Sequence, residues 1–386
     1  MHRIVAEIDL DAIEHNFNII KNHTESKIMC VVKANAYGHG IKEVAKLLDS
    51  LGADAFAVAD IDEGVELRCC GVDKPCLVLG YSDEPEKAVK YDIMPAVFDE
   101  ETAKRLSDAA VKAHKTAKIH IALDTGMSRI GFNINNMKDS GEILERIKRI
   151  YALPNIAIDG IFSHFTTADD EDGSYTKRQF DIFKSFTDKL DAEGIKVPTK
   201  HICNSAGLMM YPEMHLDMVR PGIILYGLAP SEYLQSKNFG FLPAMELKSK
   251  ISRVEELSEG TYIGYGNTFK TPHKMRVATV GIGYADGYFR QLSGKALAVY
   301  RNKKIRNVGR ICMDQCMFDA SSVNNMSVGD YMILFGKQFT ADDLAEISGT
   351  IGYELICAVG RRVPRVYLKN GVKVSEVNFL LENIVH

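Results

Sequence analysis

Residues 28–40 read Ile28-Met29-Cys30-Val31-Val32-Lys33-Ala34-Asn35-Ala36-Tyr37-Gly38-His39-Gly40, and this stretch decides the fold. Its apolar half, 28–32, predicts a buried strand, and small, turn-forming residues follow Lys33 directly. A strand that ends there would hold the Lys33 amine rigidly above the edge of a sheet. Burial removes hydration from an ammonium group and so favours the neutral amine, which can condense with an aldehyde. A single lysine at a strand end more often extends into solvent, so the rest of the chain must decide between the two interpretations.

Strand-like and helix-like segments alternate from here to residue 226. Apolar runs predict eight strands, at residues 28–32, 55–59, 76–79, 95–98, 118–123, 156–162, 201–203 and 218–226. Apolar residues recur every three or four positions in segments 41–51, 100–113, 136–151 and 175–193, which predicts helices. Strand–helix repeats of this number are typical of a parallel (β/α)8 barrel of the TIM type, expected here over residues 9–236.

The pattern changes near residues 237–243. Beyond them, strands are predicted at 245–254, 276–282, 297–300, 317–320, 330–335 and 361–368, with one helix at 341–348. Glycines and polar turns separate these runs, so a carboxyl-terminal, mainly β domain is expected over residues 237–386. The alternating residues 1–8 predict an extra strand that joins this second domain.

Composition narrows the class of protein. The chain has 386 residues and a formal net charge of −4, which gives no sign of a nucleic-acid partner. No apolar run approaches the roughly 20 residues that cross a bilayer, and the early acids Glu7 and Asp9 argue against a secretory signal. The eight cysteines are scattered and are expected to be reduced, and Cys312 and Cys316 lack a second ligand pair, so no metal site is predicted. A cytoplasmic protein without a membrane partner is expected.

The ends of the predicted barrel strands carry groups that suggest chemistry. Functional side chains of such barrels gather at the carboxyl ends of the strands. The groups found there are Lys33, Arg129, His164, Asn204-Ser205 and Arg220-Pro221-Gly222. Loops after strands seven and eight commonly bind phosphate, and Gly222 would let backbone amides approach an anion closely. Each group alone is more often structural, but together they indicate one site. The absence of a catalytic carboxylate pair and of a Gly-x-x-x-x-Gly-Lys loop disfavours glycoside hydrolysis and nucleotide hydrolysis.

With these residues in view, the chain resembles the alanine racemases, which are fold-type III pyridoxal-phosphate enzymes. In the barrel segment the matching blocks are Glu7-Ile8-Asp9-Leu10-Asp11-Ala12-Ile13, Val32-Lys33-Ala34-Asn35-Ala36-Tyr37-Gly38-His39-Gly40, Asp124-Thr125-Gly126-Met127-x-Arg129-x-Gly131, Ser163-His164-Phe165, Asn204-Ser205-Ala206 and Val219-Arg220-Pro221-Gly222-Ile223. In the second segment they are Gly264-Tyr265-Gly266, Gly281-x-Gly283-Tyr284-x-Asp286-Gly287, Gly309-Arg310-x-Cys312-Met313-Asp314-Gln315, Gly352-Tyr353-Glu354 and Arg361-Arg362-Val363-Pro364-Arg365.

The resemblance implies a homodimer in which each active site lies between the barrel of one subunit and the β domain of the other. It implies that pyridoxal 5'-phosphate is bound as a Schiff base to Lys33, and that Lys33 and Tyr265 of the partner subunit are the two catalytic bases. The residues implied around the cofactor are Lys33, Tyr37, His164, Asn204, Ser205, Arg220, Gly222, Ile223 and Tyr353. Arg129 and Met313 would bind the substrate carboxylate, and Asp169, Tyr284, Arg310 and Asp314 would line the entrance.

The implied reaction, interconversion of L-alanine and D-alanine, explains these residue types. The α-proton leaves one face of a carbon and returns on the other, so two acid–base groups must flank that carbon. For L-alanine, Tyr265 would remove the proton and Lys33 would return it. Arg220 would face the pyridine nitrogen, and since arginine offers no hydrogen-bond acceptor, that nitrogen would stay unprotonated. The expected role is D-alanine supply for peptidoglycan.

One position departs from the family pattern. Many members carry a carbamylated lysine two residues before the Asp-Thr-Gly-Met block, and its negative charge supports the arginine that binds substrate. Here that position is Ala122. A bound anion such as chloride, or a relocated acidic side chain, is therefore expected beside Arg129, because an unpaired buried charge is costly.

Three alternatives remain open at this point. The substrate could be another small amino acid such as serine, although Tyr353 would crowd the pocket and favour a methyl group. A non-catalytic pyridoxal-phosphate carrier is a second alternative, which the presence of a β domain disfavours. A related decarboxylase is the third, and Arg220 disfavours it because that position would need a carboxylate.

Overall fold

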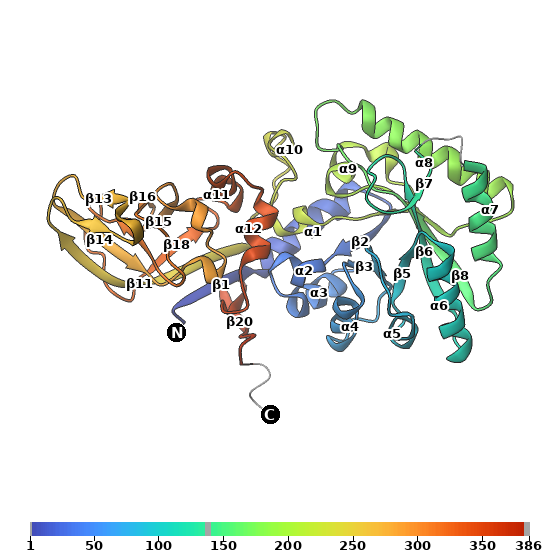
Figure 1. Cartoon of the computed structure of the whole chain (residues 1–386), viewed down its shortest axis with the longest axis horizontal. Coiled ribbons are helices and arrows are strands. Elements are labelled where there is room, and N and C mark those ends of the chain that lie inside the picture. The colour runs from blue at the N-terminus through green and yellow to red at the C-terminus, as the bar shows by residue number, and fades with distance from the viewer. Residues whose placement is uncertain (1, 136–139, 382–386) are drawn as a thin grey trace.

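The computed structural model describes residues 2–135 and 140–381. Figure 1 shows two domains side by side, a barrel with its helices and a β-rich domain, and the first and last strands, β1 and β20, lie on the side of the β-rich domain. This architecture confirms the predicted fold class, an amino-terminal (β/α)8 barrel followed by a mainly β domain.

The barrel is built from eight parallel strands that neighbour one another in the order β10-β2-β3-β4-β5-β6-β8-β9. They are β2 (Lys27–Val31), β3 (Ala55–Val58), β4 (Cys76–Val78), β5 (Met94–Val97), β6 (Ala117–Asp124), β8 (Ile156–Phe162), β9 (Thr199–His201) and β10 (Met218–Val219), and the short β7 (Phe132–Asn133) pairs with β6. A backbone hydrogen bond from Asp217 N–H to the Lys200 carbonyl, 3.1 Å long, links β9 to β10 and brings the two ends of the sheet together. Short strands buried on both faces are what a parallel sheet covered by helices requires.

Helices connect these strands around the outside (Figure 1). They are α1 (Leu10–His23), α3 (Ile41–Ser50), α4 (Ile61–Cys69), α5 (Pro85–Lys90), α6 (Glu100–Lys112), α7 (Ser140–Tyr151), α8 (Ser174–Ala192), α9 (Ser205–Met210) and α10 (Glu232–Ser236). The segment α2 (Lys33–Tyr37) is a left-handed turn at the end of β2. The predicted helices at 41–51, 100–113 and 175–193 are confirmed within one residue at either end. The helix predicted at 136–151 is present from Ser140, and residues 136–139 lie outside the described part of the chain.

The last predicted barrel strand is wrong over most of its length. The run 218–226 forms a two-residue strand, β10, and then a 3-10 helix from Ile223 to Tyr226. Pro221 has no N–H to give to a neighbouring strand, so the ladder stops there. The apolar residues beyond it are buried by the 3-10 helix rather than by a sheet.

The second domain contains a nine-stranded sheet in the order β14-β17-β16-β15-β18-β11-β1-β19-β20, and an additional pairing of β14 with β11 closes six of its strands into a barrel. The strands are β1 (Ile4–Asp9), β11 (Met245–Leu257), β14 (Met275–Val280), β15 (Leu297–Tyr300), β16 (Lys303–Val308), β17 (Cys316–Asp319), β18 (Tyr331–Phe335), β19 (Arg365–Lys369) and β20 (Val372–Val377), with a separate hairpin of β12 (Tyr262–Ile263) and β13 (Phe269–Lys270). The predicted helix at 341–348 is confirmed as α11 (Ala341–Ser348). The patterns missed α12 (Gly352–Ala358), β16 and β20 and placed the strand at 361–368 too early, since β19 begins only after Pro364.

The largest hydrophobic cluster of the described residues runs through both domains. It joins side chains of α1 and β2 to the 3-10 helix at 223–226 and to Leu355 and Ile356 of α12. In β1, antiparallel pairing with β11 on one side and parallel pairing with β19 on the other ties the start of the chain to the second domain. Within the described residues, no helix combines the length and apolar character needed to span a membrane.

Candidate active site

A cavity of about 610 Å³ lies at the carboxyl ends of the barrel strands. The residues predicted for a site that line it are Lys33, Tyr37, Arg129, His164, Asp169, Asn204, Ser205, Arg220, Gly222, Ile223 and Tyr353. The structure therefore brings together predicted residues from five barrel strand ends and from α12. Tyr353 comes from the second domain of the same chain, so the cavity is formed by both domains.

Lys33 lies at the start of an unusual turn. The four residues after it, Ala34 to Tyr37, have φ between +50° and +54°, in the left-handed region. Left-handed conformations cost an L-residue roughly 1–2 kcal/mol each, so the surrounding structure must enforce this turn. Burial lowers the pKa of Lys33, and the nearby positive charge of Arg129 lowers it further. Both effects favour the neutral amine that was expected at this position.

Side chains from both domains hold the left-handed turn. Glu63 of α4 accepts the backbone N–H groups of Ala34, at 2.6 Å, and of Ala59, at 2.7 Å. On the other side, the buried Arg365 of β19 donates from Nε to the Gly38 carbonyl at 2.9 Å. Arg365 also donates to three carbonyls of the segment 359–363. The position of the Lys33 backbone thus depends on contacts made by the second domain.

The end of the cavity beside Gly222 offers a cradle of hydrogen-bond donors. A Cβ atom on Gly222 would lie 2.7 Å from the Tyr37 hydroxyl, so only glycine leaves this space open. The Gly222 N–H donates to Ser205 Oγ at 2.9 Å, which leaves the Ser205 hydroxyl proton free to donate elsewhere. Burial raises the pKa values of Tyr37 and Tyr353 above the ordinary tyrosine value, so both remain hydroxyl donors at neutral pH.

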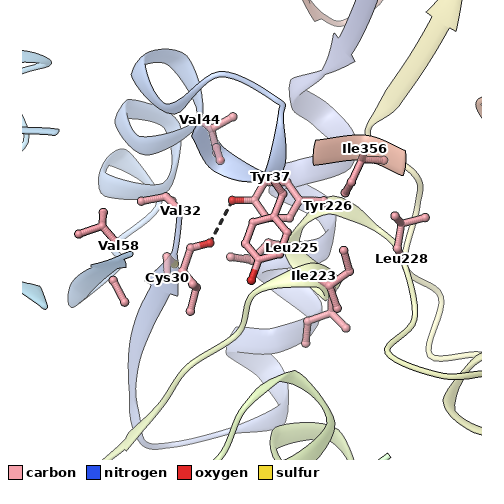
Figure 2. Close-up of a cluster of buried hydrophobic side chains, with 14 of the residues drawn as sticks. Cys30, Val32, Tyr37, Val44, Val58, Ile223, Leu225, Tyr226, Leu228 and Ile356 are labelled. Carbon is pink, nitrogen blue, oxygen red and sulfur yellow. Dashed lines mark hydrogen bonds between the residues drawn. The ribbon is translucent and has the colours of Figure 1, made fainter. Parts of the chain in front are cut away.

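Tyr37 is itself held by buried neighbours. Figure 2 shows its ring beside that of Tyr226 and close to Ile223 and Leu225. The ring centroids of Tyr37 and Tyr226 are 4.9 Å apart. The Tyr226 hydroxyl donates to the Val31 carbonyl at 3.1 Å, which ties this aromatic pair to the strand that leads to Lys33.

Arg220 is buried at the opposite side of the cavity floor and donates to several groups. It donates from one terminal nitrogen to His201 Nδ1 at 2.7 Å, and from the other to the Ser163 carbonyl at 2.8 Å and to His164 Nδ1 at 3.2 Å. Burial lowers the pKa of Arg220 to about 10, so the guanidinium remains charged at neutral pH. Burial, followed by the charge of Arg220, holds the pKa of His164 well below its ordinary value, so this imidazole is neutral.

These residues fit pyridoxal 5'-phosphate. The donor cradle at Gly222 suits a phosphate dianion, the neutral amine of Lys33 suits its aldehyde, and the fixed donor Arg220 suits a ring nitrogen that accepts a hydrogen bond. Among the described residues no cluster of three or more histidine, cysteine, aspartate or glutamate side chains is placed to hold a metal ion.

The surroundings of Arg129 leave the expected anion or relocated acidic side chain a prediction. No carboxylate of the described residues forms an ion pair with Arg129. Arg129 is exposed in the single chain, where water can solvate its charge. Ala122, at the position of the family's lysine, is buried in the cavity wall.

Five predicted site residues do not line this cavity. Tyr265, Tyr284, Arg310, Met313 and Asp314 all lie on the second domain. Tyr265 follows a left-handed glycine, Gly264, and 69% of its surface is exposed, and Met313 is 53% exposed. Asp314 forms an ion pair with Arg362 at 2.7 Å. Within one chain these groups are separate from the Lys33 cavity.

Sequence patterns missed some residues of the site. Glu63 gave a recognisable signal, since it stands three positions after the capping Asp60 at the start of a helix, but that pattern predicts a helix end rather than a contact with Ala34. His201 opened a predicted strand, and nothing in its neighbours shows that its ring faces Arg220.

Two family models match the chain, the alanine racemase N-terminal domain over residues 8–230 and the alanine racemase C-terminal domain over residues 244–367. The chain is 45% identical to the alanine racemase of Clostridium perfringens over 382 residues, which covers 97% of this chain and 98% of the relative. It is 46% identical to the alanine racemase of Methanococcus maripaludis over 375 residues, with 95% and 99% covered.

Solved structures of alanine racemases also superpose closely on this chain. The alanine racemase of Clostridium difficile superposes with a TM-score of 0.94 at 41% identity and covers 99% of this chain and 100% of its own. That of Bacillus anthracis with bound L-Ala-P superposes with a TM-score of 0.92 at 34% identity, with 98% of each chain covered.

Proposed function

Because the chain belongs to the alanine racemase family, we propose that Lys33 and Tyr265 of a partner subunit are its two proton-transferring side chains. The activity is the interconversion of L-alanine and D-alanine, an isomerase reaction that depends on pyridoxal 5'-phosphate. The observation that supports the assignment of residues is the cavity in which the Lys33 amine, whose pKa is lowered by burial, the Gly222 cradle and Arg220 face one space.

Different residues would hold the aldehyde and the phosphate of the cofactor. Lys33 would carry it, and the hydroxyls of Tyr37, Ser205 and Tyr353 with the backbone of Gly222 and Ile223 would bind its phosphate. Asn204 caps α9 through a bond from the Gly207 N–H and so positions Ser205. When bound, pyridoxal phosphate withdraws electrons from the α-carbon of the amino acid and makes its proton acidic.

The proton moves between two side chains on opposite faces of that carbon. For L-alanine, the Tyr265 oxygen takes the proton and Lys33 Nζ returns one, and for D-alanine the roles are exchanged. A tyrosine is a poor base near neutrality unless donors stabilise its oxyanion. His164 accepts from Arg220 at Nδ1, so its proton is on Nε2 and is available to stabilise that oxygen. Arg129 and Met313 would hold the substrate carboxylate.

A homodimer is required by this assignment. Tyr265 and Met313 are exposed on the second domain and do not line the Lys33 cavity of their own chain. Tyr284 is also exposed, and so is Ile351, which lines the cavity beside Tyr353. Exposed apolar and aromatic side chains at the cavity rim and on the facing domain are typical of a surface that a second subunit covers. We assign Asp169, Tyr284, Arg310 and Asp314 to the entrance between the subunits.

Hybrid dimers test the shared site directly. Lys33→Ala and Tyr265→Phe homodimers are both expected to be nearly inactive. A hybrid of the two contains one site with both defects and one with neither, so random mixing should restore about a quarter of the wild-type activity. Mixing Lys33→Ala with the double variant Lys33→Ala/Tyr265→Phe is the control, and it should restore none. If the first mixture stays inactive although hybrids form, the two bases do not come from different subunits.

Three further assignments complete the proposal. We place the domain boundaries at residues 9–236 and 237–386, with residues 1–8 in the second domain, close to the limits of the two family models. We place the protein in the cytoplasm, with D-alanine for peptidoglycan as its product. Alanine is preferred over serine because Tyr353 narrows the cavity, and kcat/KM for L-alanine against L-serine measures that preference. The match to the C-terminal domain model speaks against a non-catalytic carrier.

A further inference from the structure

A column of polar side chains runs through the interior of the barrel beneath Arg220. His201 Nδ1 lies 2.7 Å from an Arg220 nitrogen, and His201 Nε2 lies 2.9 Å from Nδ1 of His120. His120 is on β6, and both imidazoles are fully buried. Barrel interiors are ordinarily filled by layers of apolar side chains, so a pair of histidines here needs an explanation.

The barrel wall has room for the His120 ring because the residue beside it on the neighbouring strand is a glycine. Gly160 on the neighbouring strand β8 is the partner of His120 in the strand register. A Cβ atom at Gly160 would lie 2.3 Å from two ring atoms of His120. Any other residue at position 160 would displace the ring, so the site for this imidazole is built by both strands.

We infer that His120 is a positioning residue for the racemase reaction: by accepting a hydrogen bond from His201, it fixes the tautomer of His201 that accepts from Arg220. The argument starts at Arg220, which can only donate. His201 Nδ1 must therefore be unprotonated, and a neutral His201 carries its proton on Nε2. That proton points at His120 Nδ1, which must accept it. A charged His120 would need a proton on Nδ1 and would leave His201 with none, so His120 is neutral with its proton on Nε2.

The electrostatics of the site agree with two neutral rings. Burial, and then the charge of Arg220, lowers the pKa of His120 to about 3. The same two causes, with His120 third, lower the pKa of His201 well below its ordinary value.

The outer end of the column opens on a second cavity. His120 lines a space of about 130 Å³ at the amino-terminal ends of the strands, together with Asp54, Asp159 and Thr199. His120 Nε2 has no hydrogen-bond partner among the described residues. The proton that this arrangement leaves on His120 Nε2 is the one that has no acceptor among the described residues. The hydrogen bonds of the column then all run in one direction, from Arg220 to His201 and from His201 to His120.

The consequence lies in the orientation of the guanidinium. If His201 carried its proton on Nδ1, that N–H would lie opposite an N–H of Arg220, and neither group could accept a hydrogen bond. The guanidinium would then have to turn away from His201. Its bonds to Ser163 and His164 would be lost with it. The effect on catalysis rests on the proposed role of Arg220 toward the cofactor ring, whereas the tautomer of His201 does not depend on that role.

The first test measures tautomers in the apoprotein. With 15N-labelled histidine, the nitrogen chemical shifts of His201 should show Nδ1 unprotonated and Nε2 protonated in the wild-type protein. His120→Asn places an amide oxygen near the position of Nδ1 and should preserve this pattern. His120→Leu removes the acceptor and should shift His201 toward a mixture of tautomers. A protonated Nδ1 in the wild-type protein, or unchanged shifts in His120→Leu, would overturn the inference even if the proposed function holds.

The second test uses the holoenzyme and separates positioning from packing. Leucine fills the space of the ring better than asparagine does, so a packing role predicts that His120→Asn is the more damaging change. The positioning role predicts the opposite: kcat should fall about tenfold in His120→Leu and about twofold in His120→Asn. The absorption spectrum of the bound cofactor should change only in His120→Leu. The reverse order of the two variants would overturn the inference. The expected tautomer change in His120→Leu without any fall in its kcat would instead locate the failure in the proposed role of Arg220.

Discussion

The amine of Lys33 and the guanidinium of Arg129 illustrate how one residue sets the chemistry of another. Lys33 is half-buried, and both its burial and the Arg129 charge favour the neutral amine. Arg129 in turn has no carboxylate partner among the described residues, so its positive charge is felt by Lys33 without a counterion from the chain. The lysine is thereby kept reactive before any substrate arrives.

Arg129→Gln should therefore raise the pKa of Lys33 toward the ordinary value of 10.5. Loss of a neighbouring positive charge favours the ammonium form, so Lys33 should react with an amine reagent only at higher pH. The measurement is the rate of Lys33 modification in the apoprotein as a function of pH, followed by peptide mass spectrometry. Arg129→Lys keeps the charge and should leave the profile close to wild type. A profile that moves to lower pH in Arg129→Gln would contradict the assignment.

Among the elements, the left-handed turn at residues 34–37 is the most strained. Four consecutive L-residues with positive φ cost roughly 4–8 kcal/mol in total. Glu63, Arg365 and the Tyr367 hydroxyl, which donates to the His39 carbonyl at 3.0 Å, supply the hydrogen bonds that hold the turn. The strain is concentrated beside the residue that carries the chemistry, as is common at functional sites.

Ala34→Gly is expected to stabilise the protein. Glycine adopts a φ of +53° without the steric cost that alanine meets, so the free energy of unfolding should rise by about 0.5–1 kcal/mol. The control is Ala109→Gly in the right-handed helix α6, which should lower it by about 1 kcal/mol. Denaturant unfolding of both variants gives the comparison. If Ala34→Gly destabilises as much as Ala109→Gly does, the turn is not left-handed in solution.

The same elements show what could be predicted from the sequence. Apolar runs with regular spacing predicted seven of the barrel strands, because burial on both faces of a parallel strand is a local pattern. The turn after Lys33 could not be predicted, because Asn35 tolerates a left-handed conformation but the alanines on either side of it do not favour one. The contacts that enforce the turn come from residues 63 and 365. The run 218–226 failed for a related reason, since an apolar segment is equally compatible with a buried strand and a buried helix.

The sequence patterns could predict the site residues that directly follow a barrel strand of the same chain. Those from the ends of barrel strands meet in one cavity. Tyr265 and Met313 were identified only through the resemblance, since no pattern within one chain indicates that an exposed tyrosine serves the cavity of a second copy. His120 could not be predicted as part of the site, because a histidine inside an apolar strand does not indicate which side chain its ring contacts.

For the whole molecule, buried histidines make stability depend on pH. Burial lowers the pKa of His39 to about 4 and that of His120 to about 3, and His164 and His201 are lowered as well. In the unfolded chain these groups bind protons below about pH 6.5. The unfolded state therefore binds more protons than the folded state once the pH falls below that value, and stability is lost on acidification.

The free energy of unfolding should fall between pH 6.5 and 5 with a slope that approaches roughly 1.4 kcal/mol per pH unit for each of these histidines. Urea unfolding of the apoprotein across this range gives the slope. His120→Asn should make it shallower by one histidine. A slope that does not respond to His120→Asn would show that this ring takes up a proton in the folded protein.

The position of β1 has a consequence for how the chain is made. The ribosome makes this strand well before β11 and β19, its two neighbours in the sheet, which belong to the second domain. At ordinary rates of translation, the segment that includes β11 follows roughly 10–50 s later. Until then the apolar face of Ile4, Ala6 and Ile8 has nothing to pair with. A nascent chain of this protein therefore carries an unpaired apolar strand until β11 and β19 have both been synthesised.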